Sequence, residues 1–156
     1  MLQVALAPAP IALEVIDDPA QRAASQYMRA FRAAGTEARI AEIGLEAFFD
    51  KNFGPHVDPA AITAEERAAY IDEWSQPGAI PAMLAWYRAS PILVPAVGET
   101  VARPSWIDAP FPVLRMPVLV IWGMGDKALL PIQLDGLEEV VADLRVVRIE
   151  AGHFVT

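Results

Sequence analysis

The pattern of hydrophobic and polar positions predicts two strands in the last third of the chain. Apolar residues run without a polar interruption from Met116 to Trp122, between a proline-rich stretch and two glycines. A continuous apolar run between turn residues is typical of a strand in a parallel sheet that is buried on both faces. A second, shorter strand is predicted over residues 144–149, which contain four apolar residues and two arginines. Asp126 follows the first strand and His153 follows the second.

Between these strands the sequence predicts one amphipathic crossover helix over residues 131–142. Its first residue, Pro131, suits the first turn of a helix because proline lacks the backbone N–H that is unpaired there. In a strand–helix–strand unit the crossover is right-handed and both strands point in the same direction. Asp126 and His153 are therefore expected at the same carboxyl edge of the sheet, where open α/β sheets place their functional residues.

Helical spacing of apolar residues predicts four more helices before these strands. The first begins at Asp18-Pro19, an N-cap acceptor followed by a proline, and ends before Gly35. The second runs from Thr36 to about residue 49, the third begins at the capping box Thr63–Glu66, and the fourth spans about 79–89. The positions of the first helix that are expected to face the core are Ala20, Ala24, Tyr27, Met28 and Phe31.

The order of these elements predicts an α/β fold with an insertion. A short strand is predicted over Leu2–Ala7, and residues 91–117, which contain six prolines, are predicted to form a loop that leads back to the sheet. Four successive helices are too many for a simple crossover, so we expect a short parallel sheet of about three strands with an inserted α-helical cap, or lid. The expected domains are the strand and lead-in of the core at 1–15, the cap and return loop at 16–110, and the rest of the core at 111–156.

Composition and charge narrow the classes of protein to consider. Of the 156 residues, 54% are hydrophobic, which excludes a disordered chain, and the net charge of −8 disfavours nucleic acid or an anionic membrane as a partner. With no cysteine and only two histidines, neither a disulfide nor a metal site is expected, and no motif indicates a cofactor. No apolar run reaches the ~20 residues of a membrane span, and the first residues lack the basic start of a signal peptide. A cytoplasmic protein is therefore expected.

Asp126 and His153 are the candidate catalytic residues. A carboxylate bound to one imidazole nitrogen selects the tautomer of the ring and stabilises its protonated form, so the other nitrogen is a base for a hydroxyl or a water. The residues by themselves leave an alternative open, in which Asp126 caps a turn or a helix and His153 is an ordinary histidine at the end of a strand.

The same stretch resembles the end of an α/β-hydrolase, and more narrowly that of epoxide hydrolases and haloalkane dehalogenases. In that branch the acid follows the seventh strand and the histidine follows the eighth, in the order nucleophile, acid, histidine. The resemblance implies that Asp126 is the acid, that His153 is the base, and that Leu2–Ala7 is the sixth strand. The elements that carry it are Pro117–Trp122, Gly123, Asp126, the helix after it, 144–149 and Gly152-His153.

Three aromatic residues of the predicted cap extend the resemblance to epoxide hydrolases. Residues 18–31 resemble the first cap helix of those enzymes, and residues 85–88 resemble the segment that supplies their second cap tyrosine. In that family two cap tyrosines donate hydrogen bonds to the epoxide oxygen, and Tyr27 and Tyr87 occupy the matching positions. A neutral phenol suits this role because it is a hydrogen-bond donor at working pH. Trp86 is the candidate substrate-binding residue, and core packing is the alternative interpretation of both tyrosines.

The sequence departs from the family in what it lacks. The nucleophile of an α/β-hydrolase stands on a Gly-x-Ser-x-Gly or Gly-x-Asp-x-Gly elbow before the sixth strand, and no such elbow occurs here. Ala9 also stands where the family often has a histidine between two prolines. The resemblance covers the latter half of the family's domain, so the chain alone is expected to be inactive or much weaker than a complete enzyme. Its open strand edge is expected to support self-association or pairing with the missing N-terminal half.

The function expected from the resemblance is cofactor-free hydrolysis of an epoxide through a covalent alkyl-enzyme ester. The substrate would be a small hydrophobic epoxide, ester or haloalkane. One alternative is a dehalogenase or serine esterase of the same fold, and in the dehalogenase Trp86 would bind the halide. The other is a catalytically inactive remnant that serves as an interaction module.

Overall fold

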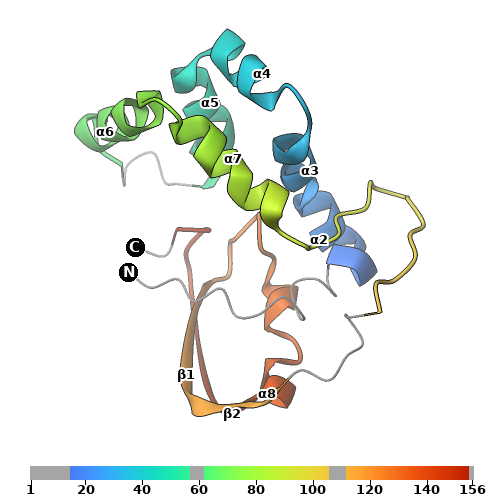
Figure 1. Ribbon diagram of the computed structural model, residues 1–156. Coiled ribbons are helices and arrows are strands. Elements are labelled where there is room, and N and C mark those ends of the chain that lie inside the picture. The colour runs from blue at the N-terminus through green and yellow to red at the C-terminus, as the bar shows by residue number, and fades with distance from the viewer. Residues whose placement is uncertain (1–14, 57–61, 106–111, 155–156) are drawn as a thin grey trace. The chain divides into compact units, whose positions relative to one another are not determined.

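The computed structural model describes residues 15–56, 62–105 and 112–154, which form a series of helices followed by a two-stranded sheet (Figure 1). The helices before the sheet are α2 (Pro19–Ala24), α3 (Gln26–Arg32), α4 (Thr36–Ile43), α5 (Leu45–Asn52), the 3-10 turn η1 (Gly54–His56), α6 (Ala64–Ser75) and α7 (Ala79–Ala89). The sheet region consists of β1 (Leu114–Gly123), the 3-10 turn η2 (Pro131–Leu134), α8 (Leu137–Val140) and β2 (Val141–Ile149). Among the described helices, none is both long enough and apolar enough to cross a membrane.

The chain divides into two compact units. The first combines Met1–Gln26 with Ile92–Thr156 and contains both strands, and the second is Tyr27–Pro91. The predicted cap, residues 16–110, extends beyond the second unit at both ends, and its role as a lid stays a prediction. The strand predicted over Leu2–Ala7 lies outside the described residues, as does Ala9.

The strands β1 and β2 lie side by side and run parallel, which confirms the predicted α/β class (Figure 1). Val118 is paired with Leu144, and the residues that follow in each strand stay in register as far as Gly123. β1 begins at Leu114, before the predicted end of the loop at Pro117, and the register shifts between these two residues. Proline has no N–H to donate to a ladder, so a strand that contains one is irregular at that point.

The prediction of one continuous crossover helix over residues 131–142 is wrong. The turn η2 ends at Leu134, Gly136 has a left-handed φ of 76°, and α8 is only four residues long. Val141 already belongs to β2. A left-handed residue interrupts a right-handed helix, and glycine adopts that conformation without a steric penalty. Val140 and Val141 are β-branched and favour the strand that follows.

The prediction that β1 is buried on both faces is also wrong. Along the strand, Val118, Val120 and Trp122 are partly buried. Leu119 is 56% exposed and Ile121 is 49% exposed. Successive side chains of a strand point to opposite faces, so one face of β1 is packed and the other is apolar but exposed. A continuous apolar run indicates a strand, but long-range packing decides which of its faces is covered.

The helices agree with the predictions in part. The third and fourth predicted helices are confirmed as α6 and α7, and α6 begins with the predicted capping box, in which Thr63 and Glu66 bind each other's backbone N–H. The first and second predicted helices are each split in two, at Ser25 and at Gly44. Gly44 has a φ of 82°, so the split there has the same cause as the one at Gly136.

The second unit has its own aromatic core, which gathers residues from α4 to α7. Phe48 packs edge-on against Trp74 with ring centroids 5.6 Å apart, and Phe49 lies 5.7 Å from the same ring. Edge-to-face and tilted aromatic pairs of this kind add to the stabilisation from burial alone. The buried members of the core are Ile40, Phe48, Phe49, Trp74 and Leu84.

Candidate active site

The ends of the two strands are joined by backbone hydrogen bonds. After β1, Met124 N–H donates to Ile149 O and Gly125 N–H donates to Ala151 O, each at 2.9 Å. These bonds continue the parallel pairing beyond the last strand residues. They bring the segment that contains Asp126 next to the segment that contains His153.

Gly123 permits this close approach. A Cβ atom placed on Gly123 would lie 2.1 Å from Gly152 O and 2.6 Å from Ala151 O, far inside van der Waals contact. No side chain fits at this position because the obstacle is backbone. A glycine at the end of β1 is therefore a condition for the geometry of the site.

Asp126 is buried and fully engaged in hydrogen bonds. Its side chain is 8% exposed. One carboxylate oxygen, Oδ1, accepts from the N–H groups of Ala128 at 2.8 Å and of Leu129 at 2.9 Å. The other, Oδ2, lies 2.8 Å from Nδ1 of His153. The loop after the acid thus holds one oxygen and leaves the second for the histidine.

The protonation of Asp126 follows from these contacts. Burial by itself raises the pKa of the carboxyl. The hydrogen bond with His153 and those from the N–H groups of Leu129 and Ala128 outweigh burial, so the net pKa lies below the ordinary aspartate value. Asp126 is therefore an anion at neutral pH.

His153 is oriented by that anion. An ionised carboxylate only accepts hydrogen bonds, so Nδ1 of the neutral ring carries the proton and Nε2 carries the lone pair. The imidazole side chain is 24% exposed, which is compatible with access for a water molecule. The ring also packs edge-on against Phe154, with centroids 5.1 Å apart. The pair meets the requirement for a general base, namely a fixed tautomer and a counter-ion.

Tyr27 and Tyr87 lie together in the second unit. Their rings meet edge to face with centroids 5.9 Å apart, although the residues come from α3 and α7. Phe31 packs against both, at 5.8 Å from Tyr27 and 4.9 Å from Tyr87. Burial raises the pKa of Tyr87, so its phenol stays protonated well above neutral pH. The structure therefore brings together the two tyrosines that the sequence singled out, in a packed aromatic cluster.

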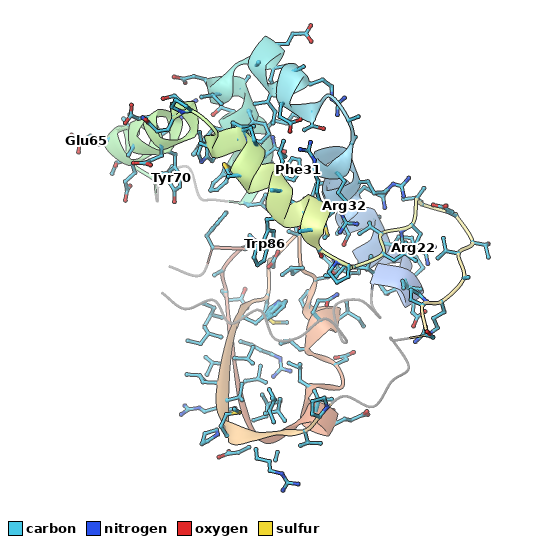
Figure 2. All side chains as sticks on the ribbon, in the orientation of Figure 1. Arg22, Phe31, Arg32, Glu65, Tyr70 and Trp86 are labelled. Atoms are coloured by element: carbon cyan, nitrogen blue, oxygen red, sulfur yellow. The ribbon has the colours of Figure 1, made fainter. Side chains whose placement is uncertain are left out.

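Trp86 differs from its neighbour Tyr87. Trp86 lies on α7 and is 72% exposed. Figure 2 labels it together with Phe31 and Arg32 of α3. A tryptophan this exposed contributes little to the core of its own unit, so a contact with a ligand or another surface stays a prediction. Within the described residues, no group of three or more carboxylate or imidazole side chains is placed to hold a metal ion.

Comparison with known proteins shows which proteins this chain is similar to. No protein-family model matches the sequence. A curated relative, the AB hydrolase superfamily protein YfhM of Bacillus subtilis (strain 168), is 36% identical over 112 residues, which are 71% of this chain and 35% of the relative. A solved structure of a novel epoxide hydrolase of the α/β-hydrolase superfamily, from metagenomes of hot environments, matches 95% of this chain at 39% identity and a TM-score of 0.81. This chain contains part of an α/β-hydrolase fold.

Another solved member of the superfamily is similar as well. It is a point mutant of an epoxide hydrolase from Bacillus megaterium in complex with its naphthyloxy-propanediol product, 30% identical over 94% of this chain, with a TM-score of 0.75. In both solved structures the match covers 50% of the other chain. The chain therefore spans about half the length of these α/β-hydrolases and 35% of the curated relative.

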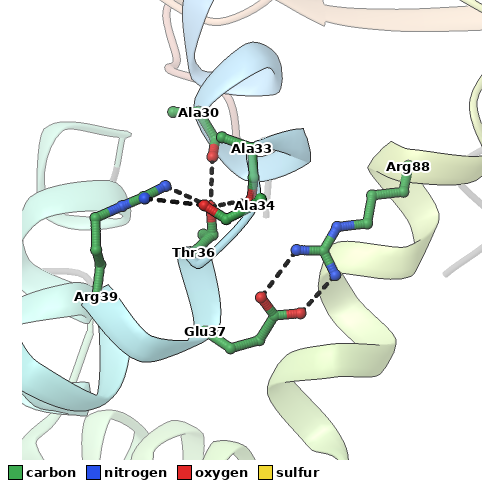
Figure 3. A network of polar contacts seen from close by, with 7 residues as sticks. All are labelled: Ala30, Ala33, Ala34, Thr36, Glu37, Arg39 and Arg88. Carbon is green, nitrogen blue, oxygen red and sulfur yellow. Dashed lines mark hydrogen bonds and ion pairs between the residues drawn. The ribbon is translucent and has the colours of Figure 1, made fainter.

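In this α/β-hydrolase chain, two ties hold α7 against α3 and α4. Arg32 on α3 donates through Nε to Tyr87 O at 2.8 Å and through Nη2 to Ser90 O at 3.4 Å. Arg88 on α7 forms an ion pair with Glu37 on α4, and this contact holds the pKa of Glu37 at about 2 (Figure 3). Both ties lie beside Tyr87, so they restrain the helix that presents it.

The end of α3 is tied to α4 in the same network. The hydroxyl of Thr36 lies 2.8 Å from the carbonyl oxygens of both Ala30 and Ala33, and Arg39 donates to that hydroxyl at 2.6 Å (Figure 3). The last carbonyls of a helix have no partner within the helix, so a hydroxyl from the next turn satisfies them. The turn between α3 and α4 is therefore ordered by side chains.

Sequence reasoning missed one residue of the first unit, Gln21. On α2, the predicted buried position Ala20 is exposed, whereas Gln21 and Ser25 are 0% and 1% exposed. The amide of Gln21 binds the loop that follows Asp126, through Ala128 O at 2.9 Å and Leu130 N–H at 2.8 Å. A glutamine beside apolar helix positions carries no local signal for this contact, because its partners in that loop lie more than a hundred residues away in the sequence.

Proposed function

We propose that this chain is the cap-and-base part of an epoxide hydrolase. The observation that carries the proposal is the 2.8 Å contact between His153 Nδ1 and Asp126 Oδ2 in a chain that is 39% identical to an epoxide hydrolase over 95% of its length. A histidine held by a buried anion at the end of parallel strands has the features required of a base that activates water.

The proposed reaction proceeds through a covalent ester. A nucleophilic carboxylate attacks an epoxide carbon, the carbon–oxygen bond of the strained ring breaks, and the leaving oxygen takes a proton from a tyrosine hydroxyl. His153 then removes a proton from a water molecule, and the hydroxide attacks the ester carbonyl and displaces the diol oxygen. The two protons of the water pass to that diol oxygen and to the tyrosinate, which restores the carboxylate, the neutral imidazole and the tyrosine. Asp126 stabilises the imidazolium that forms in this step.

The nucleophile itself is proposed to come from residues outside this sequence. The 156 residues contain no Gly-x-Ser-x-Gly or Gly-x-Asp-x-Gly elbow. We therefore expect the chain by itself to show no turnover, and activity to depend on the half of the domain that bears the elbow. An aspartate there leads to epoxide or haloalkane chemistry, and a serine leads to ester hydrolysis.

Tyr27 and Tyr87 are proposed to donate hydrogen bonds to the epoxide oxygen. An alkoxide is a poor leaving group, and two neutral donors lower the barrier to its departure. The edge-to-face contact between the two rings keeps both phenols in one cluster, and burial keeps Tyr87 protonated. The exposed Trp86 is proposed to contact the apolar part of the substrate.

The substrate class we propose is a small epoxide with an aromatic substituent. The product bound to the similar Bacillus megaterium enzyme is a naphthyloxy-propanediol, which corresponds to a terminal epoxide plus one water. Naphthyl glycidyl ether is therefore the first substrate to test, with a nitrophenyl ester and a haloalkane as the substrates of the alternative chemistries.

The experiment combines this chain with the N-terminal half of the metagenomic epoxide hydrolase and measures diol formation. We expect activity only in the reconstituted sample. His153→Ala should reduce it by at least about 10²-fold, the contribution of a positioned base. His56→Ala, at the only other histidine of the chain, is the matched control and should leave the rate unchanged. Equal rates for the two variants, or no activity in a folded and associated sample, would overturn the proposal.

A second candidate function, an interaction module, is favoured by the exposed face of β1. Leu119 and Ile121 are about half exposed although the run to which they belong is apolar throughout. We propose that this face contacts the complementary half of an α/β-hydrolase domain. Under the enzyme hypothesis the contact assembles the active site, and under the module hypothesis association occurs without catalysis and does not require His153.

A further inference from the structure

Among the described residues of the first unit, Gln21 has the most completely buried polar side chain. It is 0% exposed, and its amide makes three hydrogen bonds to other parts of that unit. Nε2 donates to Ser25 Oγ and to Ala128 O, each at 2.9 Å, and Oε1 accepts from Leu130 N–H at 2.8 Å. Both amide protons and the carbonyl oxygen therefore have partners, which is what a buried glutamine requires to avoid an unpaired polar group.

The loop that Gln21 binds is the loop that binds Asp126. The N–H groups of Ala128 and Leu129 point to Oδ1 of Asp126, and the carbonyl of Ala128 and the N–H of Leu130 point to Gln21. The peptide group between Ala128 and Leu129 is thus bound by both side chains, its carbonyl by the glutamine and its N–H by the acid. Within the described residues, this connects helix α2 to the carboxylate through hydrogen bonds alone.

We propose that Gln21 is a positioning residue for the Asp126–His153 pair. It holds residues 128–130 through Ala128 O and Leu130 N–H, so that Oδ1 keeps its two backbone donors and Oδ2 stays directed at Nδ1 of His153. The inference rests on the proposed function only in taking this pair as the water-activating base. The geometry of the pair is a property of the chain itself and is measured without turnover.

Loss of the glutamine amide has a defined consequence. An unrestrained loop lets the carboxylate rotate away from the imidazole, and the ring then loses the acceptor that selects its Nδ1–H tautomer. In water a neutral imidazole without such a partner prefers the Nε2–H form. The tautomer of His153 therefore reports the position of Asp126, and a general change in stability does not shift it.

The test is nitrogen NMR of the full chain labelled with ¹⁵N-histidine, at a pH where the ring is neutral. In the wild type we expect the Nδ1–H tautomer at His153. Gln21→Met keeps the length and removes all three hydrogen bonds, and we expect it to convert most of His153 to the Nε2–H form. Gln26→Met is the matched control. Gln26 also donates to two carbonyls, Arg22 O and Pro95 O, and neither carbonyl belongs to the loop that follows Asp126.

Two further variants keep the test decisive. If Gln21→Met does not fold, Gln21→Asn replaces it, because it keeps an amide but is too short by one methylene to span the same distance. Ser25→Ala removes only the hydrogen bond between Gln21 and Ser25 and leaves the two bonds from Gln21 to the loop after Asp126. We expect it to leave the His153 tautomer unchanged. A His153 tautomer unchanged in the folded Gln21 variant, or changed equally by Gln26→Met, would overturn the proposal.

The reconstituted enzyme provides a separate readout. A misplaced base slows the chemical step, so Gln21→Met should lower kcat by about 10-fold to 100-fold and change KM little. If the wild-type assembly hydrolyses no epoxide, the proposed function fails while the NMR result still decides the role of Gln21. A normal tautomer together with a normal kcat in the Gln21 variant refutes the positioning role alone.

Discussion

At the scale of single residues, Gly123 and Asp126 determine the candidate site in different ways. Gly123 acts through the absence of a side chain, because the carbonyl oxygens of Ala151 and Gly152 occupy the space where a Cβ would be. Asp126 acts through its charge, which three hydrogen bonds stabilise in a buried position. One substitution at each position therefore measures a steric contribution, at Gly123, and an electrostatic contribution, at Asp126, to the free energy of unfolding.

Gly123→Ala is expected to destabilise the first unit by about 1–3 kcal/mol or more, because the two segments after the strands must move apart to admit a methyl group. Urea unfolding measures the loss. Gly54→Ala is the control, since a Cβ there meets no atom within 4 Å and the residue has no left-handed φ. Similar unfolding free energies for the two variants would contradict the close packing at Gly123.

The pH dependence of stability tests the electrostatics of Asp126. Its pKa is lower in the folded chain than the ordinary 3.8, so ionisation favours folding at neutral pH. That contribution is fully present above the unfolded pKa and is lost as the pH falls through the folded pKa. The difference in unfolding free energy between wild type and Asp126→Asn should therefore be largest near neutral pH and shrink below about pH 4.

Urea unfolding at several pH values measures that difference. Asp143→Asn, at an exposed position of β2, is the control. A difference for Asp126→Asn that stays constant from neutral to acidic pH would mean that the carboxylate is not held by the contacts described.

At the scale of elements, glycine determines where the helices end, and side chains determine how they are joined. Gly44 and Gly136 have left-handed φ angles, and both lie where the sequence pattern alone predicts a continuous helix. In the second unit, α7 is joined to α3 through Arg32 and to α4 through the Glu37–Arg88 ion pair. These two ties differ in kind, because one satisfies backbone carbonyls and the other joins charges at the surface.

Arg32→Leu is expected to destabilise the second unit by about 1–3 kcal/mol, because the carbonyls of Tyr87 and Ser90 lose their donor at a partly buried helix end. It should also weaken the near-ultraviolet circular dichroism of the tyrosine cluster. Arg88→Leu is the comparison, since exposed ion pairs contribute little and are screened by salt. A larger loss for Arg88→Leu than for Arg32→Leu would reverse the assigned importance of the two ties.

At the scale of the whole molecule, the two units have different means of stabilisation. The second has an aromatic core of its own, whereas the first pairs two strands and leaves an apolar strand face exposed. Exposed apolar surface of this kind marks an interaction site. Because the chain matches half of each similar structure, we propose that this face contacts the other half of the domain.

Leu119→Lys tests that face. Burial of a leucine contributes about 1.5–3 kcal/mol, so the substitution should weaken binding of the complementary N-terminal half by at least about tenfold. Isothermal titration or a pull-down with that half measures the change. Val97→Lys is the control, because Val97 is 67% exposed but belongs to a loop outside the sheet. Equal effects at both positions would show that β1 does not form the contact.

The sequence by itself determined the elements whose signals are local. The capping box at Thr63 and the apolar run of β1 follow from residues that are neighbours in the chain, and the parallel pairing with β2 follows from the order strand, crossover, strand. The order of Asp126 and His153 at the ends of those strands also follows from the sequence, and so does the likeness to α/β-hydrolases. Short-range propensities and periodicity suffice for such features.

Only the tertiary structure decided the features that depend on distant residues. The exposure of Leu119, the requirement for glycine at position 123 and the two hydrogen bonds from Gln21 to the loop after Asp126 each depend on groups far apart in the sequence. The two backbone hydrogen bonds between the segments after β1 and β2 likewise bring Asp126 within reach of His153. The physical reason is that packing and buried hydrogen bonds are satisfied between segments, and no local pattern records which segments will meet.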